Sequence, residues 1–239
     1  IGITGTNGKS TVTTLVTDMV NATGKTALMG GNVGIPALDL LAESAPDFYV
    51  LELSSFQLAR TFNINAAVGV LLNITEDHLN WHGSMQAYTD AKMRLLDQSK
   101  IQVLGTPNVP SSSTVILVPR AKPEGSGIQS TVSSGIARYK ARMLNETSLK
   151  SSTLSPVLRQ THNRINTECA LQVIEALGLP LEPALDVAAT FKGLSHRCEH
   201  VPTNDGITWI DDSKATNIGA AIAAIESIAS TGKLILIAG

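Results

Sequence analysis

The chain has 239 residues, of which 43% are hydrophobic and 16% are charged. This length and composition are typical of a globular α/β protein with one large domain or two smaller ones. A formal net charge of −2 excludes the basic composition of nucleic-acid-binding and membrane-surface proteins. No apolar run reaches the roughly 20 residues needed to cross a bilayer. Cys169 and Cys198 lack the spacing of metal ligands, which favours a reducing, cytoplasmic location.

A glycine loop close to the first residue is the most informative segment. Residues 1–4 are suited to the end of a strand, and residues 11–20 place apolar side chains at helical spacing. A strand, a loop and a helix in this order direct free backbone N–H groups toward an anion. The general phosphate-loop pattern requires glycine at position 3, where this chain has Ile3. Gly5, Gly8, Lys9 and Ser10 nevertheless predict a nucleoside-triphosphate site, with an ordinary tight turn as the alternative.

The same order of strand, loop and helix repeats along the next hundred residues. Strands are predicted at 26–29, 48–53, 66–74 and 101–104, and helices at 36–43, from 54 and at 85–98. Thr75 is predicted to cap a helix that begins at 76. These elements predict a doubly wound, mostly parallel sheet in the α/β class. The loop at Lys9, the loop at Asn32, Glu52 and residues 75–78 would then lie at one edge of the sheet.

The second half of the chain is less regular. Residues 105–160, including a β-like run at 114–118, are predicted to form an added, loop-rich β segment. Helices are predicted at 167–177 and 181–191. We expect one domain at 1–193 and the start of a second, Rossmann-like α/β domain at 194–239, with a strand at 207–211, a helix at 220–228 and a strand at 234–237. Because the final strand pattern has no following helix, we expect the chain to be part of a longer protein.

Several polar residues could bind ligands, but each has a simpler interpretation. Glu52 ends a strand beside the glycine loop and could hold Mg²⁺, or it could be an exposed strand-end carboxylate. Taken alone, His78 is more typical of a structural histidine and Lys92 of a solvated helix face. The polar cluster at residues 195–197 and 212–217 could bind a ligand or form a capped surface turn.

The motifs taken together resemble the Mur ligases, in order along most of the chain: residues 5–11, 30–34, 52–57, 75–79, 88–92, 162–166, 196–197 and 211–217. This resemblance implies the central ATP-binding domain of a three-domain enzyme, followed by the start of its C-terminal domain. It also implies an ATP-dependent ligase that joins D-glutamate to a UDP-linked muramoyl-L-alanine substrate through an acyl phosphate. Another Mur ligase, a folylpolyglutamate synthetase and a non-ligase nucleotide-binding module are the alternatives.

The resemblance also implies roles for individual residues. ATP would be bound by Gly5, Thr6, Asn7, Gly8, Lys9, Ser10, Thr11, Asn163, Asn166, Arg197 and Asp212. Ser10 and Glu52 would hold one Mg²⁺, and His78 with a carbamylated Lys92 would hold a second. Asn32, Ser54, Lys214 and Thr216 would contact the substrates, and the catalytic set would be Lys9, His78, Lys92, Arg197 and Lys214. We further expect a cytoplasmic monomer with no nucleic-acid or membrane partner.

Overall fold

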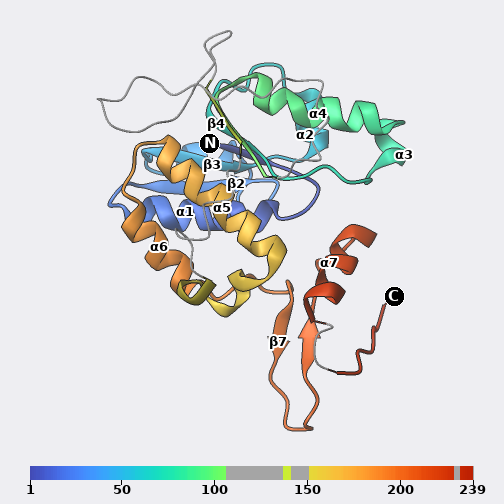
Figure 1. Ribbon diagram of the computed structural model, residues 1–239. Helices are drawn as coiled ribbons and strands as arrows, with labels where there is room; N and C mark the ends of the chain where they lie inside the picture. The colour runs from blue at the N-terminus through green and yellow to red at the C-terminus, as the bar shows by residue number, and fades with distance from the viewer. Residues whose placement is uncertain (106–136, 141–150, 229–231, 239) are drawn as a thin grey trace.

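The computed structural model describes residues 1–105, 137–140, 151–228 and 232–238. Its centre is a six-stranded sheet in the order β2-β3-β1-β4-β5-β6, in which every neighbouring pair is parallel (Figure 1). Because β1 lies between β3 and β4, the ends of these three strands meet at one edge, where ligands bind in open α/β sheets. The strands are β1 (Gly2–Thr4), β2 (Ala27–Gly31), β3 (Phe48–Glu52), β4 (Ala66–Leu71), β5 (Ser99–Leu104) and β6 (Ala137–Lys140).

Helices cover both faces of the sheet, as Figure 1 shows. On one face α1 (Lys9–Ala22) packs against α5 (Thr161–Ala176) and α6 (Leu181–Thr190). On the other face α2 (Ser55–Arg60) packs against α4 (Met85–Asp97), and the short α3 (Leu79–His82) lies beside α4. Parallel strands need such crossover connections. The predicted doubly wound α/β fold is therefore confirmed.

The largest core lies between the sheet and α1. Val12, Leu15, Val16 and Met19 are fully buried, as their helical spacing predicts. They pack in one cluster with Ile3 of β1. This packing holds the strand and the helix on either side of the glycine loop, and so it fixes both ends of that loop.

Two local predictions in this part of the chain are wrong. Residues 36–43 contain only a 3₁₀ turn, η1 (Asp39–Ala42). Leu40 is buried, but Leu38 and Leu41 are 79% and 67% exposed, so the segment lacks the continuous buried face that stabilises a longer helix. Thr75 caps no helix, because residues 76–78 are not helical; its backbone N–H and C=O instead bond to the hydroxyl of Thr6. The next helix, α3, begins only after His78.

Residues 194–228 add a β-hairpin and a helix. β7 (Glu199–Val201) pairs antiparallel with β8 (Trp209–Asp211), and α7 (Ile218–Ile228) follows. The predicted strand at 207–211 and the helix at 220–228 are confirmed with shifted ends. The predicted strand at 234–237 is wrong, because residues 232–238 have no regular secondary structure. A strand needs a neighbour for its backbone hydrogen bonds, and no strand in the described ranges lies beside this segment.

The segment at 105–160 is described only in part. β6 extends the sheet beside β5, and two 3₁₀ turns follow, η2 (Ser151–Thr153) and η3 (Pro156–Arg159). The predicted run at 114–118 lies outside the described residues, and the domain boundary at 193/194 stays a prediction. Within the ranges that the structure describes, no helix has both the length and the apolarity needed to cross a bilayer.

Candidate active site

The glycine loop joins the end of β1 to the start of α1. Gly8 precedes α1 in the left-handed conformation, at φ 85°. A Cβ at this position would also lie 2.5 Å from the side-chain oxygen of Asn166, so only glycine fits. Within the described part of the chain, no side chain caps the start of α1. The N–H groups of its first turn therefore remain available to an anion, which the positive end of the helix dipole attracts.

Two residues after β4 hold the loop in shape. Asn73 bonds to both backbone groups of Asn7: its Oδ1 accepts from Asn7 N at 2.9 Å, and its Nδ2 donates to Asn7 O at 2.9 Å. The hydroxyl of Thr6 bonds to the backbone of Thr75 and lies 2.9 Å from the Tyr88 hydroxyl. The loop is thus anchored to β4 and α4 as well as to α1.

Two lysine ammonium groups converge on the carbonyl oxygen of Gly5. Lys9 Nζ donates to Gly5 O at 3.1 Å and to Thr6 O at 2.8 Å, and Lys92 Nζ donates to Gly5 O at 2.8 Å. Lys92 is only 2% exposed, and its Nζ lies 4.6 Å from the centre of the Tyr88 ring. Burial and then the charge of Lys9 lower the pKa of Lys92 to about 7. Burial also lowers the pKa of Lys9.

Glu52 provides a buried carboxylate at the end of β3, beside these lysines. It is 2% exposed, and its Oε1 accepts a hydrogen bond from Asn32 Nδ2 at 3.0 Å. Its other oxygen, Oε2, is buried and has no hydrogen-bond partner among the described residues. A buried carboxylate oxygen without a partner is costly. Its chemistry suits Mg²⁺, which prefers oxygen ligands.

Arg197, which is distant in the sequence, contacts the start of the helix that follows the loop. Arg197 Nη2 donates to the hydroxyl oxygen of Ser10 at 3.1 Å, although 187 residues separate the two. Burial has the largest effect on the pKa of Lys9 and lowers it, the charge of Glu52 raises it, and the charge of Arg197 lowers it. Arg197 therefore lies where it could bind the same phosphate group as the loop.

His78 lies on the outer side of this region. Its side chain is 46% exposed, and its Nδ1 is 3.4 Å from Asp77 Oδ1. Its ring lies 4.8 Å from the Phe56 ring and 6.4 Å from the Tyr88 ring. His78 and Lys92 thus contact the same tyrosine. The structure therefore brings together two residues that, taken singly, are weak candidates for a metal site.

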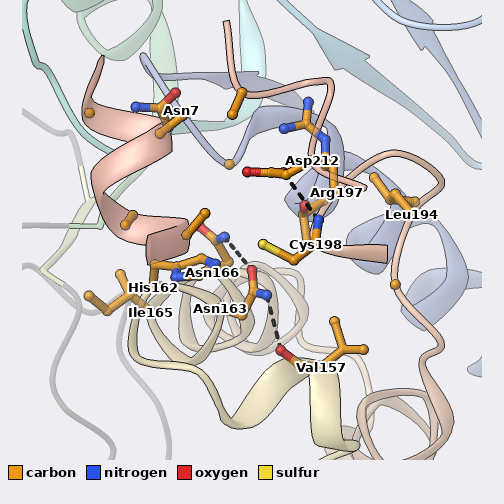
Figure 2. A pocket seen from close by; sticks show the side chains of 18 of the residues that line it. Asn7, Val157, His162, Asn163, Ile165, Asn166, Leu194, Arg197, Cys198 and Asp212 are labelled. Carbon is orange, nitrogen blue, oxygen red and sulfur yellow. Dashed lines mark hydrogen bonds between the residues drawn. The ribbon is translucent and has the colours of Figure 1, made fainter. Parts of the chain in front are cut away.

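A pocket opens beside the loop, lined by residues of α5, α7 and the segment that leads into the β-hairpin (Figure 2). Three polar residues of α5 line one side, namely His162, Asn163 and Asn166. Asn163 Nδ2 donates to Val157 O at 3.0 Å, and Asn166 Nδ2 donates to Asn163 Oδ1 at 3.2 Å. The two asparagines are 9% and 5% exposed. Oriented amides in an apolar lining are suited to binding a nucleotide base.

Arg197 and Asp212 come from either side of the hairpin, and both line this pocket. Their neighbours in the sequence hold the hairpin closed. His196 Nδ1 lies 2.7 Å from Asp211 Oδ2, and this contact, together with hydrogen bonds from Ser213, lowers the pKa of Asp211 to about 2. Asp212 Oδ1 accepts a hydrogen bond from Cys198 N at 3.1 Å. The predicted polar cluster therefore directs one cation and one carboxylate toward the pocket.

Four predicted substrate contacts lie outside this pocket. Asn32 bonds to the buried carboxylate already described. The hydroxyl of Ser54 forms a capping box with Gln57 at the start of α2. Lys214 and Thr216 are exposed in the turn before α7. Their substrate roles, like the other site assignments, stay predictions.

Three residues that shape the site were given no role by the sequence. Asn73 anchors the loop, Tyr88 contacts both candidate second-metal residues, and Asn217 contacts Asn7. A partial signal exists for each of them. Asn73 directly follows an apolar strand pattern, Tyr88 stands four residues before Lys92 on one helix face, and Asn217 ends the polar cluster.

The parallel sheet, the glycine loop at the end of its central strand and the carboxylate beside it define an α/β protein of the phosphate-loop type. The Mur ligase middle domain matches residues 3–173 of the chain. The chain belongs to the Mur ligase family.

Two curated relatives match the chain along its whole length. The UDP-N-acetylmuramoylalanine--D-glutamate ligase of Shewanella oneidensis is 43% identical over 249 residues, which cover 100% of this chain and 54% of the relative. The enzyme of the same name from Nitrosococcus oceani is 40% identical over 250 residues, with 100% and 53% covered. The chain therefore spans about half the length of the curated relatives that it matches.

Solved structures share the fold at low sequence identity. MurF from Acinetobacter baumannii has a TM-score of 0.65 at 17% identity, over 97% of this chain and 54% of that one. The bifunctional folylpolyglutamate synthase/dihydrofolate synthase of Yersinia pestis, complexed with AMPPNP and Mn ion, has a TM-score of 0.65 at 17% identity. That comparison covers 95% of this chain and 65% of the other.

Proposed function

We propose that the chain is the nucleotide-binding part of an ATP-dependent ligase that adds D-glutamate to UDP-N-acetylmuramoyl-L-alanine, a step of peptidoglycan precursor synthesis. The observation that carries this proposal is the convergence of the glycine loop, Glu52 and Lys92 at one edge of the sheet. The names of the relatives that are 40% and 43% identical to the whole chain support D-glutamate as the amino acid.

The proposed reaction activates a carboxylate before an amine attacks it. A carboxylate oxygen of the muramoyl substrate attacks the γ-phosphorus of ATP, the bond to the bridging oxygen breaks, and ADP leaves. The amine of D-glutamate then attacks the acyl carbon. The carbon–oxygen bond to phosphate breaks, phosphate leaves and the nitrogen loses a proton. Because the reacting groups are anions that repel one another, positioning and charge neutralisation are the enzyme's main tasks.

The residues around the loop are suited to these tasks. Residues 5–11 would bind the phosphates through those N–H groups that are not already bonded to Asn73, and Lys9 would exchange its two carbonyl partners for the β- and γ-phosphates. Arg197 would exchange its bond to Ser10 for the γ-phosphate. Asn163 and Asn166 would face adenine, and Asp212 would face the ribose.

Four residues around the loop would hold divalent cations. Ser10 and Glu52 would hold one Mg²⁺, and His78 and Lys92 a second, and bound Mg²⁺ supplies charge neutralisation at the phosphates. A lysine ammonium cannot ligate a metal, so we infer that Lys92 is carbamylated. Its neutral amine would attack the carbon of CO₂ and lose a proton, giving an anionic oxygen donor. The pKa of about 7 supports this step, because the amine is then substantially neutral near neutral pH.

The remaining assignments concern substrates and organisation. Asn32 and Ser54 would contact the muramoyl substrate, and Lys214 and Thr216 would lie near the reacting groups. Residues 1–193 would form the ATP-binding domain, and residues 194–239 the start of a C-terminal domain that completes the site. We expect the enzyme to act as a monomer in the cytoplasm.

The test measures phosphate release by the complete gene product that includes this chain. It is supplied with ATP, Mg²⁺, UDP-N-acetylmuramoyl-L-alanine and one amino acid at a time. We expect release with D-glutamate alone. Release with meso-diaminopimelate or L-lysine instead would assign another Mur ligase, and activity with a folate substrate would assign a folylpolyglutamate synthetase.

Lys92→Ala separates a ligase from a simple nucleotide-binding module. We expect this variant to lose ligation while its affinity for MgATP changes little. Lys100→Ala, at an exposed position of β5, is the matched control and should ligate normally. Normal ligation by Lys92→Ala would contradict the second-metal role. A wild-type protein that binds MgATP but releases no phosphate in response to an amine would indicate the non-ligase module.

A further inference from the structure

Asn217 links the C-terminal part of the described chain to the tip of the glycine loop. Its Nδ2 donates to Asn7 Oδ1 at 3.0 Å, and Asn7 Nδ2 donates to Asn217 Oδ1 at 3.4 Å. The two side-chain amides therefore form a reciprocal pair across 210 positions of sequence.

The loop side of this pair is held firmly. Asn73 bonds to the backbone N–H and C=O of Asn7 and leaves the Asn7 side chain available to bond to Asn217. Three asparagines thus run in series from the end of β4, through the loop, to the start of α7.

The helix side of the pair is equally well defined. Asn217 Oδ1 accepts the N–H of Ala220 at 2.9 Å, and Asn217 O accepts the N–H of Ala221 at 3.1 Å. Asparagine is among the preferred residues for such an N-cap. One side chain therefore both starts α7 and attaches it to the loop.

The attached helix forms one wall of the pocket. Gly219, Ala220, Ala223 and Ala224 of α7 line it, and α5 lines another side with the asparagines predicted to face adenine. Figure 2 shows this arrangement, with α7 and α5 contributing different sides of the same space. Small side chains on α7 leave room there for a planar base.

We propose that Asn217 is a positioning residue for the bound nucleotide. Its pairing with Asn7 sets the separation between α7 and the glycine loop, and hence the width of the pocket that receives the base. Asn217 acts through α7 and need not touch the nucleotide. This inference rests on the proposed nucleotide-binding function, and it adds a determinant of affinity to that site.

The test measures MgADP binding by isothermal titration calorimetry to the complete gene product that includes this chain. Asn217→Ser keeps a hydroxyl that can cap α7, but its side chain is too short to reach Asn7. Asn7→Ala breaks the pair from the other side and leaves the cap intact. We expect each variant to weaken MgADP binding roughly tenfold, the effect of losing two part-buried neutral hydrogen bonds. The double variant should bind no more weakly than either single variant, because both changes remove the same interaction. Asn204→Ser, at an exposed hairpin position, is the control and should bind like the wild type.

A second measurement does not depend on nucleotide. Amide hydrogen exchange in the nucleotide-free chain should be faster in residues 218–228 of the Asn7→Ala variant, although α7 itself is unchanged. Unchanged MgADP affinity in both single variants, or fully additive losses in the double variant, would overturn the positioning role. If the complete wild-type protein bound no MgADP, the proposed function and the positioning role would both fail, while the exchange rates would still show whether the pair holds α7.

Discussion

Lys92 allows a direct test of how burial of a charge in the site affects stability. Its side chain is 2% exposed, and its pKa is about 7, against 10.5 for an ordinary lysine. Between these two pH values the unfolded chain binds more protons than the folded chain. The contribution of Lys92 to the free energy of unfolding therefore rises with pH. Replacing Lys92 by methionine, which has a similar length and no charge, removes this pH-dependent penalty.

The size of the effect follows from the two pKa values. At about 1.4 kcal/mol per pKa unit, the shift opposes folding by about 4 to 5 kcal/mol at and below pH 7. Near pH 10 the same penalty falls to about 1 kcal/mol. Loss of the hydrogen bond to Gly5 O offsets about 1 kcal/mol at every pH. We therefore expect Lys92→Met to be more stable than the wild type by about 3 kcal/mol near pH 7 and equally stable near pH 10.

The measurement is urea unfolding followed by circular dichroism at pH 6.5, 8 and 10. Nucleotide, metal and bicarbonate are left out so that Lys92 stays an unmodified amine. Comparison of the two proteins at each pH cancels the titration of the groups that do not interact with Lys92. Lys100→Met, at an exposed position, should change the free energy of unfolding by less than about 0.5 kcal/mol throughout. A difference between Lys92→Met and wild type that does not vary with pH would refute the reasoning.

Three further predictions concern the loop, the core and a helix cap. Asn73→Ala removes two hydrogen bonds that hold the loop. It should lower the free energy of unfolding by about 1 to 2 kcal/mol and weaken MgADP binding roughly tenfold. The control Asn63→Ala, at an exposed position, should do neither. Unchanged affinity of Asn73→Ala for MgADP would show that the loop needs no such anchor. Leu15→Ala, at a fully buried position of α1, should lower the free energy of unfolding by about 2 to 5 kcal/mol. The control Leu38→Ala, at a position 79% exposed, should lower the free energy of unfolding by less than about 0.5 kcal/mol. Equal losses for the two leucine variants in urea unfolding would contradict the observed burial. Gln57→Ala should destabilise the protein by about 1 kcal/mol through loss of the capping box, seen as a lower Tm, and an unchanged Tm would argue against that cap.

The elements that sequence predicts well are those with a strong local pattern. The buried face of α1 follows from apolar residues at helical spacing, and the glycine loop follows from Gly8, whose left-handed φ excludes most other residues. The predictions for 36–43 and 234–237 fail for the opposite reason. Both segments have suitable composition, but only Leu40 is fully buried between residues 36 and 43, and no strand in the described structure pairs with residues 234–237.

The candidate site likewise combines features that the sequence predicts with features that only the tertiary structure reveals. Sequence alone determined that an anion-binding loop lies between a strand and a helix, and that Glu52 ends a strand, because these depend on residues close together in the chain. Only the tertiary structure decided that Lys92 shares a carbonyl with Lys9, and that Asn217 reaches Asn7. The contacts of Lys92 with Gly5 and of Asn217 with Asn7 cross 87 and 210 positions of sequence, and burial is the largest cause that lowers the pKa of Lys92. Neither the partner nor the burial of a side chain is set by its own neighbours in the chain, since both depend on how the sheet and helices pack.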